Sequence, residues 1–266
     1  MTRERRSGGR SAKSGRTGGG IAQLPHRSVQ NPYPPMELLS PDQMQQLHDT
    51  SMRILSELGI RVMSDRVMDI FEGAGAIVDR ETSTIRIDES IVMAAIATAP
   101  SQFTLTPRNL EKRLQIGGNH ICFGLVAGPP NVHDRINGRR SGNLPDYENF
   151  IRLAHHFNAI DIIGNQVTSP MELPANNRHL DTYRANLTLS DLSFHCTAIG
   201  RGRAMDGINM MAISRGISVA EMALDPGVIT IISVNSPPLF DDAIGQCLTD
   251  MAEHRTPVTV TPRSLI

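Results

Sequence analysis

The feature that most constrains this chain is a series of apolar, β-branched runs that recur at nearly regular intervals in its second half. The runs begin near residues 160, 193, 228 and 257, so consecutive runs are separated by about 33, 35 and 29 residues. Each interval holds one strand, one helix and two short loops, which is one βα unit. Because the runs are apolar on both faces, they are typical of a parallel sheet covered by helices. The pattern predicts an α/β fold.

Helix-patterned stretches lie between these runs, at about 177–189, 201–215 and 240–254. A further helix is predicted to start after the N-cap Asn143 and to bury a stripe that includes Tyr147 and Ile151. Four βα units in succession fit either half of a (β/α)8 barrel or most of a doubly wound sheet. The chain has neither G-x-G-x-x-G nor G-x-x-x-x-G-K-[ST], the motifs of dinucleotide and P-loop sheets. The barrel is therefore the favoured interpretation.

The second half is too short for a whole barrel of this kind. A (β/α)8 barrel needs about 250 residues from its first strand onward, whereas 107 residues remain from Ile160 to Ile266. We therefore expect residues 143–266 to form a partial barrel that holds strands one to four and is truncated after the fourth.

The region before the barrel has a more antiparallel pattern. Ser40 and Pro41 open a helix that Gly59 is placed to end, and further helices are predicted at 65–74 and 88–99. Short strands separated by turn residues are predicted at 77–78, 85–87, 103–105, 114–116, 120–123 and 131–133. Residues 31–142 are therefore predicted to form a small α+β region.

Residues 1–30 are basic and rich in Gly, Arg and Ser. The segment holds seven basic residues against one acidic residue. Such a composition cannot bury enough apolar surface to order itself, and it lacks the apolar stretch of a secretory signal. We expect a disordered, solvated tail, with a nucleic-acid-contacting arm as the alternative.

The remaining composition excludes several classes of protein. A formal net charge of -1 over 266 residues gives no reason to expect nucleic acid or an anionic membrane as the partner of the folded part. No uninterrupted apolar run approaches the roughly 20 residues that span a bilayer. The three cysteines (Cys122, Cys196 and Cys247) are odd in number and widely spaced, which favours a reducing cytoplasm over a disulfide framework. We therefore expect a cytoplasmic protein.

An ordered series of segments spread over residues 38–262 is similar to one family of enzymes. The segments are Leu39–Gln43, Leu55–Val62, Ala74–Ala76, Ala99–Leu105, Phe123–Gly124, Gly128–Asp134, Ile160–Gly164, Arg178–Leu180 and Asn235–Asp241. In this order they resemble the N-terminal part of the trimethylamine methyltransferase family, the corrinoid-dependent methyltransferases of methylamines and glycine betaine. No single segment is diagnostic, and the order of the series carries the resemblance.

The resemblance implies a TIM-type barrel that moves a methyl group from a methylated amine to the cobalt of a separate corrinoid protein. The implied substrate is trimethylamine or a quaternary amine such as glycine betaine, and the implied cofactor is a corrinoid that the partner carries. The position that distinguishes the pyrrolysine-containing branch would lie downstream of Ile266. The alternatives are a truncated, non-catalytic remnant or one piece of a split enzyme, and a different TIM-barrel enzyme. A homo-oligomer is also compatible with the resemblance.

In a barrel of this type the substrate lies at the carboxyl ends of the strands. The residues at these ends are predicted to bind substrate, because their amides and hydroxyls can orient a carboxylate or carbonyl group; capping of the next helix is the alternative role. They are Asn165, Gln166, Thr197, Asn235, Ser236 and Thr261.

A cationic methylammonium head also favours an aromatic face. The chain has three Tyr, seven Phe and no Trp, and Phe123, next to a Gly-rich segment, is the best-placed aromatic candidate, with core packing as its alternative role. Methyl transfer from a quaternary ammonium needs no acid to protonate the leaving amine first, and the sequence assigns no catalytic residue.

The histidines do not form the pattern of a metal site. His155 and His156 are neighbours on a predicted helix and point in different directions. His195 and Cys196 alternate between the two faces of a predicted strand. The chain has neither H-E-x-x-H nor C-x-x-C. We therefore expect no metal bound directly by this chain.

Overall fold

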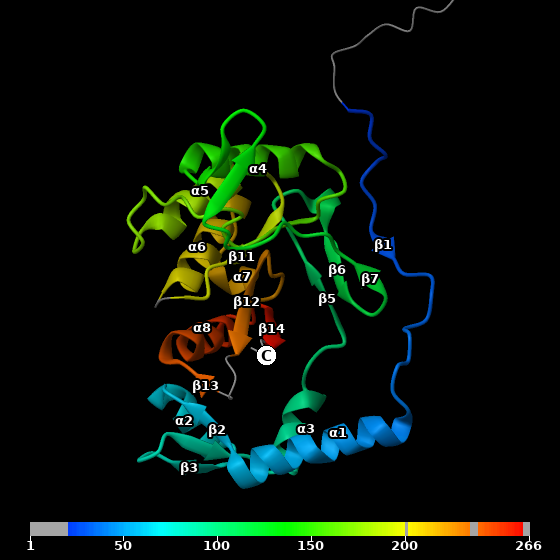
Figure 1. The fold of residues 1–266 in the computed structure, drawn as a ribbon, viewed down its shortest axis with the longest axis vertical. Coiled ribbons are helices and arrows are strands. Elements are labelled where there is room, and N and C mark those ends of the chain that lie inside the picture. The colour runs from blue at the N-terminus through cyan, green and yellow to red at the C-terminus, as the bar shows by residue number, and fades with distance from the viewer. Residues whose placement is uncertain (1–20, 200–201, 235–238, 263–266) are drawn as a thin grey trace, which may run out of the picture.

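The computed structural model describes residues 21–199, 202–234 and 239–262 (Figure 1). These residues form a mixed α/β fold that contains a parallel sheet, in agreement with the class that the strand spacing predicts. Residues 1–20, which make up most of the predicted tail, lie outside the described ranges. Among the described helices, none is both long enough and apolar enough to cross a membrane.

The second half of the chain is built on a four-stranded parallel sheet. Its strands are β10 (Ile162–Ile163), β11 (Ser193–Cys196), β12 (Val228–Val234) and β14 (Val258–Pro262). They lie in the sheet in chain order, whereas the strand order of a doubly wound sheet reverses at a switch point. Within the described ranges the sheet is open and does not close into a barrel.

Helices cover one face of this sheet. They are α4 (Leu144–His156), α5 (Arg178–Leu189), α6 (Arg203–Arg215), the short α7 (Val219–Met222) and α8 (Asp242–Glu253). Their buried side chains pack with alternate strand residues, among them Phe194 and Cys196 of β11. The bounds of α5, α6 and α8 lie within two residues of the predicted ones, and the sequence pattern did not predict α7.

The parallel arrangement begins earlier in the chain than predicted. Gly124 forms a parallel bridge with Ile162 at the free edge of β10. The Leu125 N–H donates to the Ile162 carbonyl at 3.1 Å, and the Ile162 N–H donates to the Phe123 carbonyl at 3.3 Å. Residues 123–125 thus add a fifth parallel position, and α4 connects this position to β10.

A second sheet lies at the N-terminal side of the fold. Helix α1 (Pro41–Arg53) continues as a turn of π-helix to Leu58 and ends at Gly59, whose φ of 80° suits a residue without a side chain. Helices α2 (Asp65–Gly73) and α3 (Glu89–Ala97) follow. The sheet has the order β13-β2-β4-β3, with β13 (Leu239–Phe240), β2 (Ile60–Val62), β4 (Thr84–Arg86) and β3 (Ile77–Asp79).

The predicted antiparallel pairing of residues 77–78 with 85–87 is confirmed by β3 and β4, with Val78 opposite Ile85. Strand β13 comes from the second half of the chain and runs parallel to β2. This pairing, which the sequence pattern did not predict, joins the N-terminal region to the residues just before α8.

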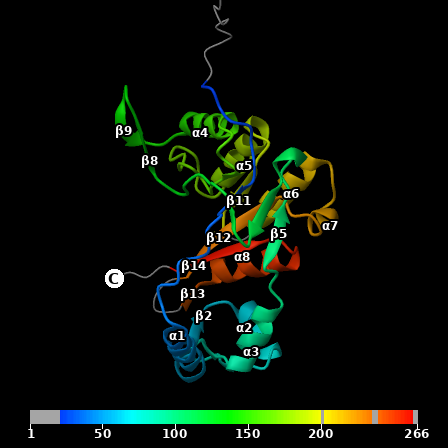
Figure 2. The same ribbon diagram turned by 90° about the vertical axis from the view of Figure 1, so that its right-hand side faces the viewer.

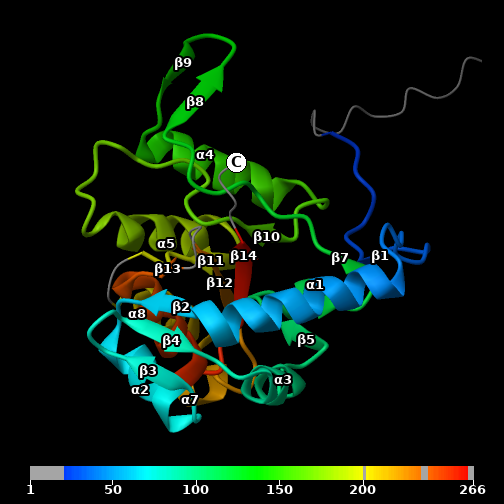
Figure 3. The same cartoon turned by 60° about the horizontal axis from the view of Figure 1, so that its bottom comes forward.

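The described residues also form three antiparallel pairs. They are β1 (Val29–Gln30) with β7 (His120–Ile121), β5 (Gln102–Leu105) with β6 (Leu114–Gly117), and β8 (Asn131–Asp134) with β9 (Gly138–Ser141). Two of them, β1–β7 and β5–β6, lie beside the parallel sheet (Figure 1). The hairpin β8–β9 projects from the body of the molecule (Figures 2 and 3).

Helix α1 carries an apolar stripe that the described part of the chain does not cover. The sequence places Met44, Leu47, Ile54, Leu55 and Leu58 on one face, but no residue of α1 itself is buried. Met44 and Leu47 are each 56% exposed, and Leu55 alone of the five packs against the cluster around β2 and β4. The periodicity predicted the helix correctly, but it did not predict what this face contacts.

Residues 21–30 differ from the expectation of a solvated tail. The Gln23 side chain accepts a hydrogen bond from the Asn158 N–H at 2.8 Å and donates to the His156 carbonyl at 2.8 Å. A ring nitrogen of His26 lies 3.1 Å from a carboxylate oxygen of Asp161. The segment thus makes hydrogen bonds to the end of α4 and to the loop between α4 and β10, which its composition does not reveal.

Candidate functional site

Two predicted site residues meet at the carboxyl ends of neighbouring parallel strands. Asn165 lies two residues beyond β10, and Thr197 directly follows β11. The Thr197 hydroxyl donates a hydrogen bond to Asn165 Oδ1 at 3.1 Å. The bond fixes the orientation of the amide and leaves its NH2 group, a donor, available for another partner.

A buried tyrosine holds Thr197 from behind the sheet. The Thr197 N–H donates to the Tyr183 hydroxyl at 2.6 Å, and that hydroxyl donates to the Arg203 carbonyl at 3.2 Å. Burial raises the pKa of Tyr183 well above its usual value, so the hydroxyl keeps its proton. The carboxyl end of β11 is thereby joined to α5 and to the start of α6.

Gln166 belongs to a tight loop at the same end of the sheet. Its backbone is left-handed, with a φ of 46°, which is uncommon for a residue with a side chain. Its carbonyl accepts a hydrogen bond from the Gly128 N–H at 2.9 Å, and its side chain accepts one from the Ser169 hydroxyl at 3.3 Å. The loop that leads into β8 is thus bound to the end of β10.

Gly164 permits this close approach of the two segments. A Cβ atom on Gly164 would overlap the carbonyl oxygens of Leu125 and Val126. Because those are backbone atoms, they cannot rotate away. The hairpin β8–β9 therefore rises from a loop that is anchored at the carboxyl end of the parallel sheet.

Two hydroxyl groups lie together near the carboxyl ends of the next two strands, β12 and β14. Thr261 lies on β14 opposite Ser233 of β12. Their hydroxyl oxygens are 3.0 Å apart, and Thr261 also lies 3.0 Å from the Ile232 carbonyl, to which it donates. The predicted residues Asn235 and Ser236, which follow β12, lie outside the described residues.

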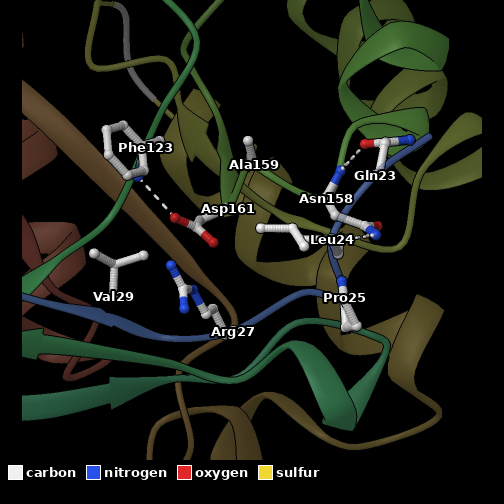
Figure 4. A pocket seen from close by; sticks show the side chains of 9 residues that line it. All are labelled: Gln23, Leu24, Pro25, Arg27, Val29, Phe123, Asn158, Ala159 and Asp161. Carbon is white, nitrogen blue, oxygen red and sulfur yellow. Dashed lines mark hydrogen bonds between the residues drawn. The ribbon is translucent and has the colours of Figure 1, made fainter. Parts of the chain in front are cut away.

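Phe123 is separated from the other candidates. It is 50% exposed and lines a cavity of about 340 Å³ together with Asn158 and Asp161, which come before β10 (Figure 4). Its N–H donates to the Asp161 carboxylate at 2.8 Å. The cavity therefore lies toward the amino end of β10, opposite the end that carries Asn165 and Thr197. The structure does not bring Phe123 to the predicted mouth.

His195, which the sequence analysis considered only as a metal ligand, lies on β11 two residues before Thr197. Phe194 and Cys196 point into the core beneath the helices, so alternation places His195 on the opposite, inner face of the sheet. Its Nδ1 atom is buried and has no hydrogen-bond partner within the described ranges. Burial lowers the pKa of His195 to about 4, so the ring is neutral near pH 7. The alternation of Ser193, His195 and Thr197 with apolar residues is the sequence signal that could have identified it.

The floor of the inner face is apolar. Ile162 of β10 and Ile229 of β12 pack there with Leu105 and Leu114 of the hairpin β5–β6. Because β11 and β12 pair with His195 opposite Ile229, the imidazole lies at the border between this floor and the polar carboxyl ends.

In the part of the chain that the structure describes, no group of three or more His, Cys, Asp or Glu side chains is arranged to hold a metal ion. The arrangement at the carboxyl ends is instead a set of neutral donors and acceptors: an amide, hydroxyls and an imidazole. Such a set can orient a small polar molecule by hydrogen bonds.

Comparison with known proteins identifies a family. The model described as Trimethylamine methyltransferase (MTTB) matches residues 5–266. The glycine betaine methyltransferase of Desulfitobacterium hafniense (strain Y51) is 30% identical over 220 residues, which are 83% of this chain and 45% of the relative. The L-carnitine:corrinoid methyltransferase of Eubacterium limosum is 28% identical over 151 residues, 56% of this chain and 29% of the relative.

A shorter match leads to the Trimethylamine methyltransferase MttB of Desulfitobacterium hafniense (strain DSM 10664 / DCB-2). It is 30% identical over 84 residues, which are 32% of this chain and 17% of the relative. In each of these comparisons the aligned region covers less than half of the relative.

Proposed function

Because this chain belongs to the trimethylamine methyltransferase family, we propose that it takes part in moving a methyl group from a methylated amine to the cobalt of a separate corrinoid protein. The hydrogen bond between Thr197 and Asn165 is the observation that supports a substrate site at these residues. It joins two neutral polar side chains at the carboxyl ends of adjacent parallel strands, where barrel enzymes bind their substrates.

The proposed fold is the first part of a TIM-type (β/α)8 barrel. The parallel strands follow chain order, and Gly124 at the edge of β10 supports counting residues 123–125 as one more barrel strand. With that count the barrel part begins near residue 122 rather than at 143, and the N-terminal α+β region ends there. The hairpin β8–β9 then belongs to the first βα loop, on the side where substrate and partner meet.

The proposed roles of the residues follow from their chemistry. The amine would be oriented, with one C–N bond pointing out of the mouth, by Asn165, Thr197 and the loop that contains Gln166. The other residues predicted to bind substrate at the carboxyl ends are Thr261, Asn235 and Ser236. Exclusion of water and alignment of the reacting atoms lower such a barrier by several kcal/mol.

With the partner's corrinoid bound opposite this mouth, its Co(I) form would supply the electron pair for the new bond to the methyl carbon, and the amine nitrogen would keep the electrons of the broken C–N bond. The role proposed for this chain is to orient the amine toward the corrinoid through neutral groups, such as the hydrogen-bonded pair Asn165 and Thr197. No proton has to be placed on the leaving nitrogen of a quaternary amine.

The experiment measures methylation of a Co(I) corrinoid protein by absorbance, with glycine betaine and with trimethylamine. The 266-residue chain alone is expected to be inactive, because four or five strands build only part of a mouth. The chain joined to the C-terminal half of the glycine betaine methyltransferase is expected to methylate the corrinoid with one of the two substrates. An inactive joined form that folds cooperatively would contradict the proposed function.

A further inference from the structure

A groove of about 480 Å³ lies between the hairpin β8–β9 and helix α4. Its apolar side chains come from both elements: Val132 and Ile136 from the hairpin, and Phe150 and Leu153 from α4. Ile136, in the turn of the hairpin, is 92% exposed, and Leu153 is 49% exposed. Single exposed apolar side chains are common, but a group of them along one groove is typical of an interaction surface.

The hairpin is held in one conformation without a partner. A carboxylate oxygen of Asp134 accepts hydrogen bonds from the N–H groups of Ile136, at 2.8 Å, and Asn137, at 2.7 Å, which close the turn. Arg140 on β9 forms ion pairs with Asp134 and with Asp146 in the first turn of α4. The turn is therefore fixed relative to α4, and little conformational entropy is lost when a partner binds it.

The exposed charges at the tip of the hairpin are positive. Arg135 in the turn and Arg139 on β9 are both exposed. The two carboxylates that line the groove, Asp134 and Asp146, are already paired with Arg140. An apolar side chain flanked by carboxylates would complement this surface. The apolar lining favours a protein partner over a nucleic acid, which would use the arginines alone.

The position of the hairpin in the fold indicates which protein can reach it. Its base is bound to the carboxyl end of β10: the Gly128 N–H donates to the Gln166 carbonyl at 2.9 Å, and the Ser169 N–H donates to the Pro129 carbonyl at 2.9 Å. In the proposed function, the cobalt of the corrinoid protein must come within bonding distance of a methyl group at these same carboxyl ends. A protein that brings the cobalt there meets the hairpin, which projects from the body of the molecule (Figure 2).

We propose that the groove between β8–β9 and α4 is the docking surface for the corrinoid protein. The partner inserts an apolar side chain into the groove and places carboxylates beside Arg135 and Arg139. The arginines speed the encounter by attracting these carboxylates, and the apolar contacts with Ile136 and Leu153 slow dissociation. The inference rests on the proposed function, since it assigns a surface to the partner of that reaction.

The test measures binding of a cobalamin-loaded corrinoid protein, the one used in the methylation assay, to the 266-residue chain by surface plasmon resonance. Because contacts within the described ranges hold the hairpin, the chain should bind even without turnover. Ile136→Ser and Leu153→Ser should each weaken binding by about 5- to 30-fold, mainly through faster dissociation. Arg135→Glu should slow association by about 3- to 10-fold and reduce its dependence on salt. The matched controls, Ile77→Ser and Arg61→Glu, change exposed residues of the second sheet and should bind as the parent does.

Equal affinities of Ile136→Ser and Ile77→Ser, or no binding by the parent chain, would overturn the inference. It would also be overturned if Ile136→Ser abolished self-association in analytical ultracentrifugation, or binding to an RNA oligonucleotide, while the corrinoid protein still bound as to the parent. A second copy or a nucleic acid would then be the occupant of the groove.

The joined form separates this inference from the proposed function. Methylation at limiting corrinoid protein that is as fast with Ile136→Ser as without it keeps the function and overturns the docking surface. Binding of the corrinoid protein that depends on Ile136, together with a folded but inactive joined form, keeps the docking surface and contradicts the function.

Discussion

Replacing Gly164 with alanine should destabilise the protein, because the carboxyl end of β10 is built on a backbone-to-backbone contact. The added methyl group would overlap the carbonyl oxygens of Leu125 and Val126. Relief requires the two segments to separate, which weakens the bond from the Leu125 N–H to the Ile162 carbonyl (3.1 Å) and the bond from Gly128 to Gln166 (2.9 Å). Overpacking costs about 1 to 3 kcal/mol, and each weakened hydrogen bond adds about 0.5 to 1.5 kcal/mol.

The free energy of unfolding is therefore expected to fall by about 2 to 4 kcal/mol in Gly164→Ala. It can be measured by urea unfolding followed by circular dichroism, at a protein concentration on which the midpoint does not depend. Gly73→Ala is the matched control: it lies at the end of α2, a Cβ there meets no atom within 4 Å, and alanine should leave stability equal or up to about 1 kcal/mol higher. Equal unfolding free energies for the two variants would refute the close approach of residues 125 and 164.

Three further predictions concern the site and the surface. Thr197→Val leaves Asn165 Oδ1 without its donor and should lower the free energy of unfolding by about 1 to 2 kcal/mol. The control Thr259→Val, at an exposed position of β14, should change it by less than about 0.5 kcal/mol. Equal effects of the two substitutions in urea unfolding would count against the hydrogen bond. The pKa of His195 is lowered to about 4 from 6.5, so the unfolded chain binds the proton first and stability falls as the pH drops from about 6.5 toward 4. His195→Gln should make urea unfolding less sensitive to pH over that window, and parallel pH curves for the two proteins would contradict the burial. Leu47→Lys should reduce the binding of a hydrophobic dye without lowering stability, because the side chain is 56% exposed, and a loss of stability would show that this face of α1 is covered.

The regular elements of the second half could be predicted because their signals are local. Apolar runs of strand length, and caps such as Asn143, specify β11, β12, β14, α4 and α8 from neighbouring residues alone. The hydrogen bond between Thr197 and Asn165 also follows from a general rule, because the carboxyl ends of adjacent parallel strands lie side by side.

The features that the sequence did not reveal depend on contacts between distant residues. In the sequence analysis, residues 123–125 were assigned to the antiparallel region, because the sequence of so short a strand does not show whether it pairs parallel or antiparallel with its neighbour. The placement of Phe123 depends on this pairing, which brings it to Asp161 and away from Asn165. His195 was judged only as a metal ligand. Its neutral state follows from burial beside the apolar floor, to which the β5–β6 hairpin contributes from far away in the chain.

The most direct test of the account is where a methylated amine binds on this chain. Glycine betaine can be titrated into the isotope-labelled protein while backbone amide signals are followed by NMR, with choline as the reference. Binding at the carboxyl ends of the parallel strands predicts saturable shifts for Gly164, Asn165 and Thr197. Shifts centred instead on Phe123 and Asn158, at the cavity near the amino end of β10, would contradict it.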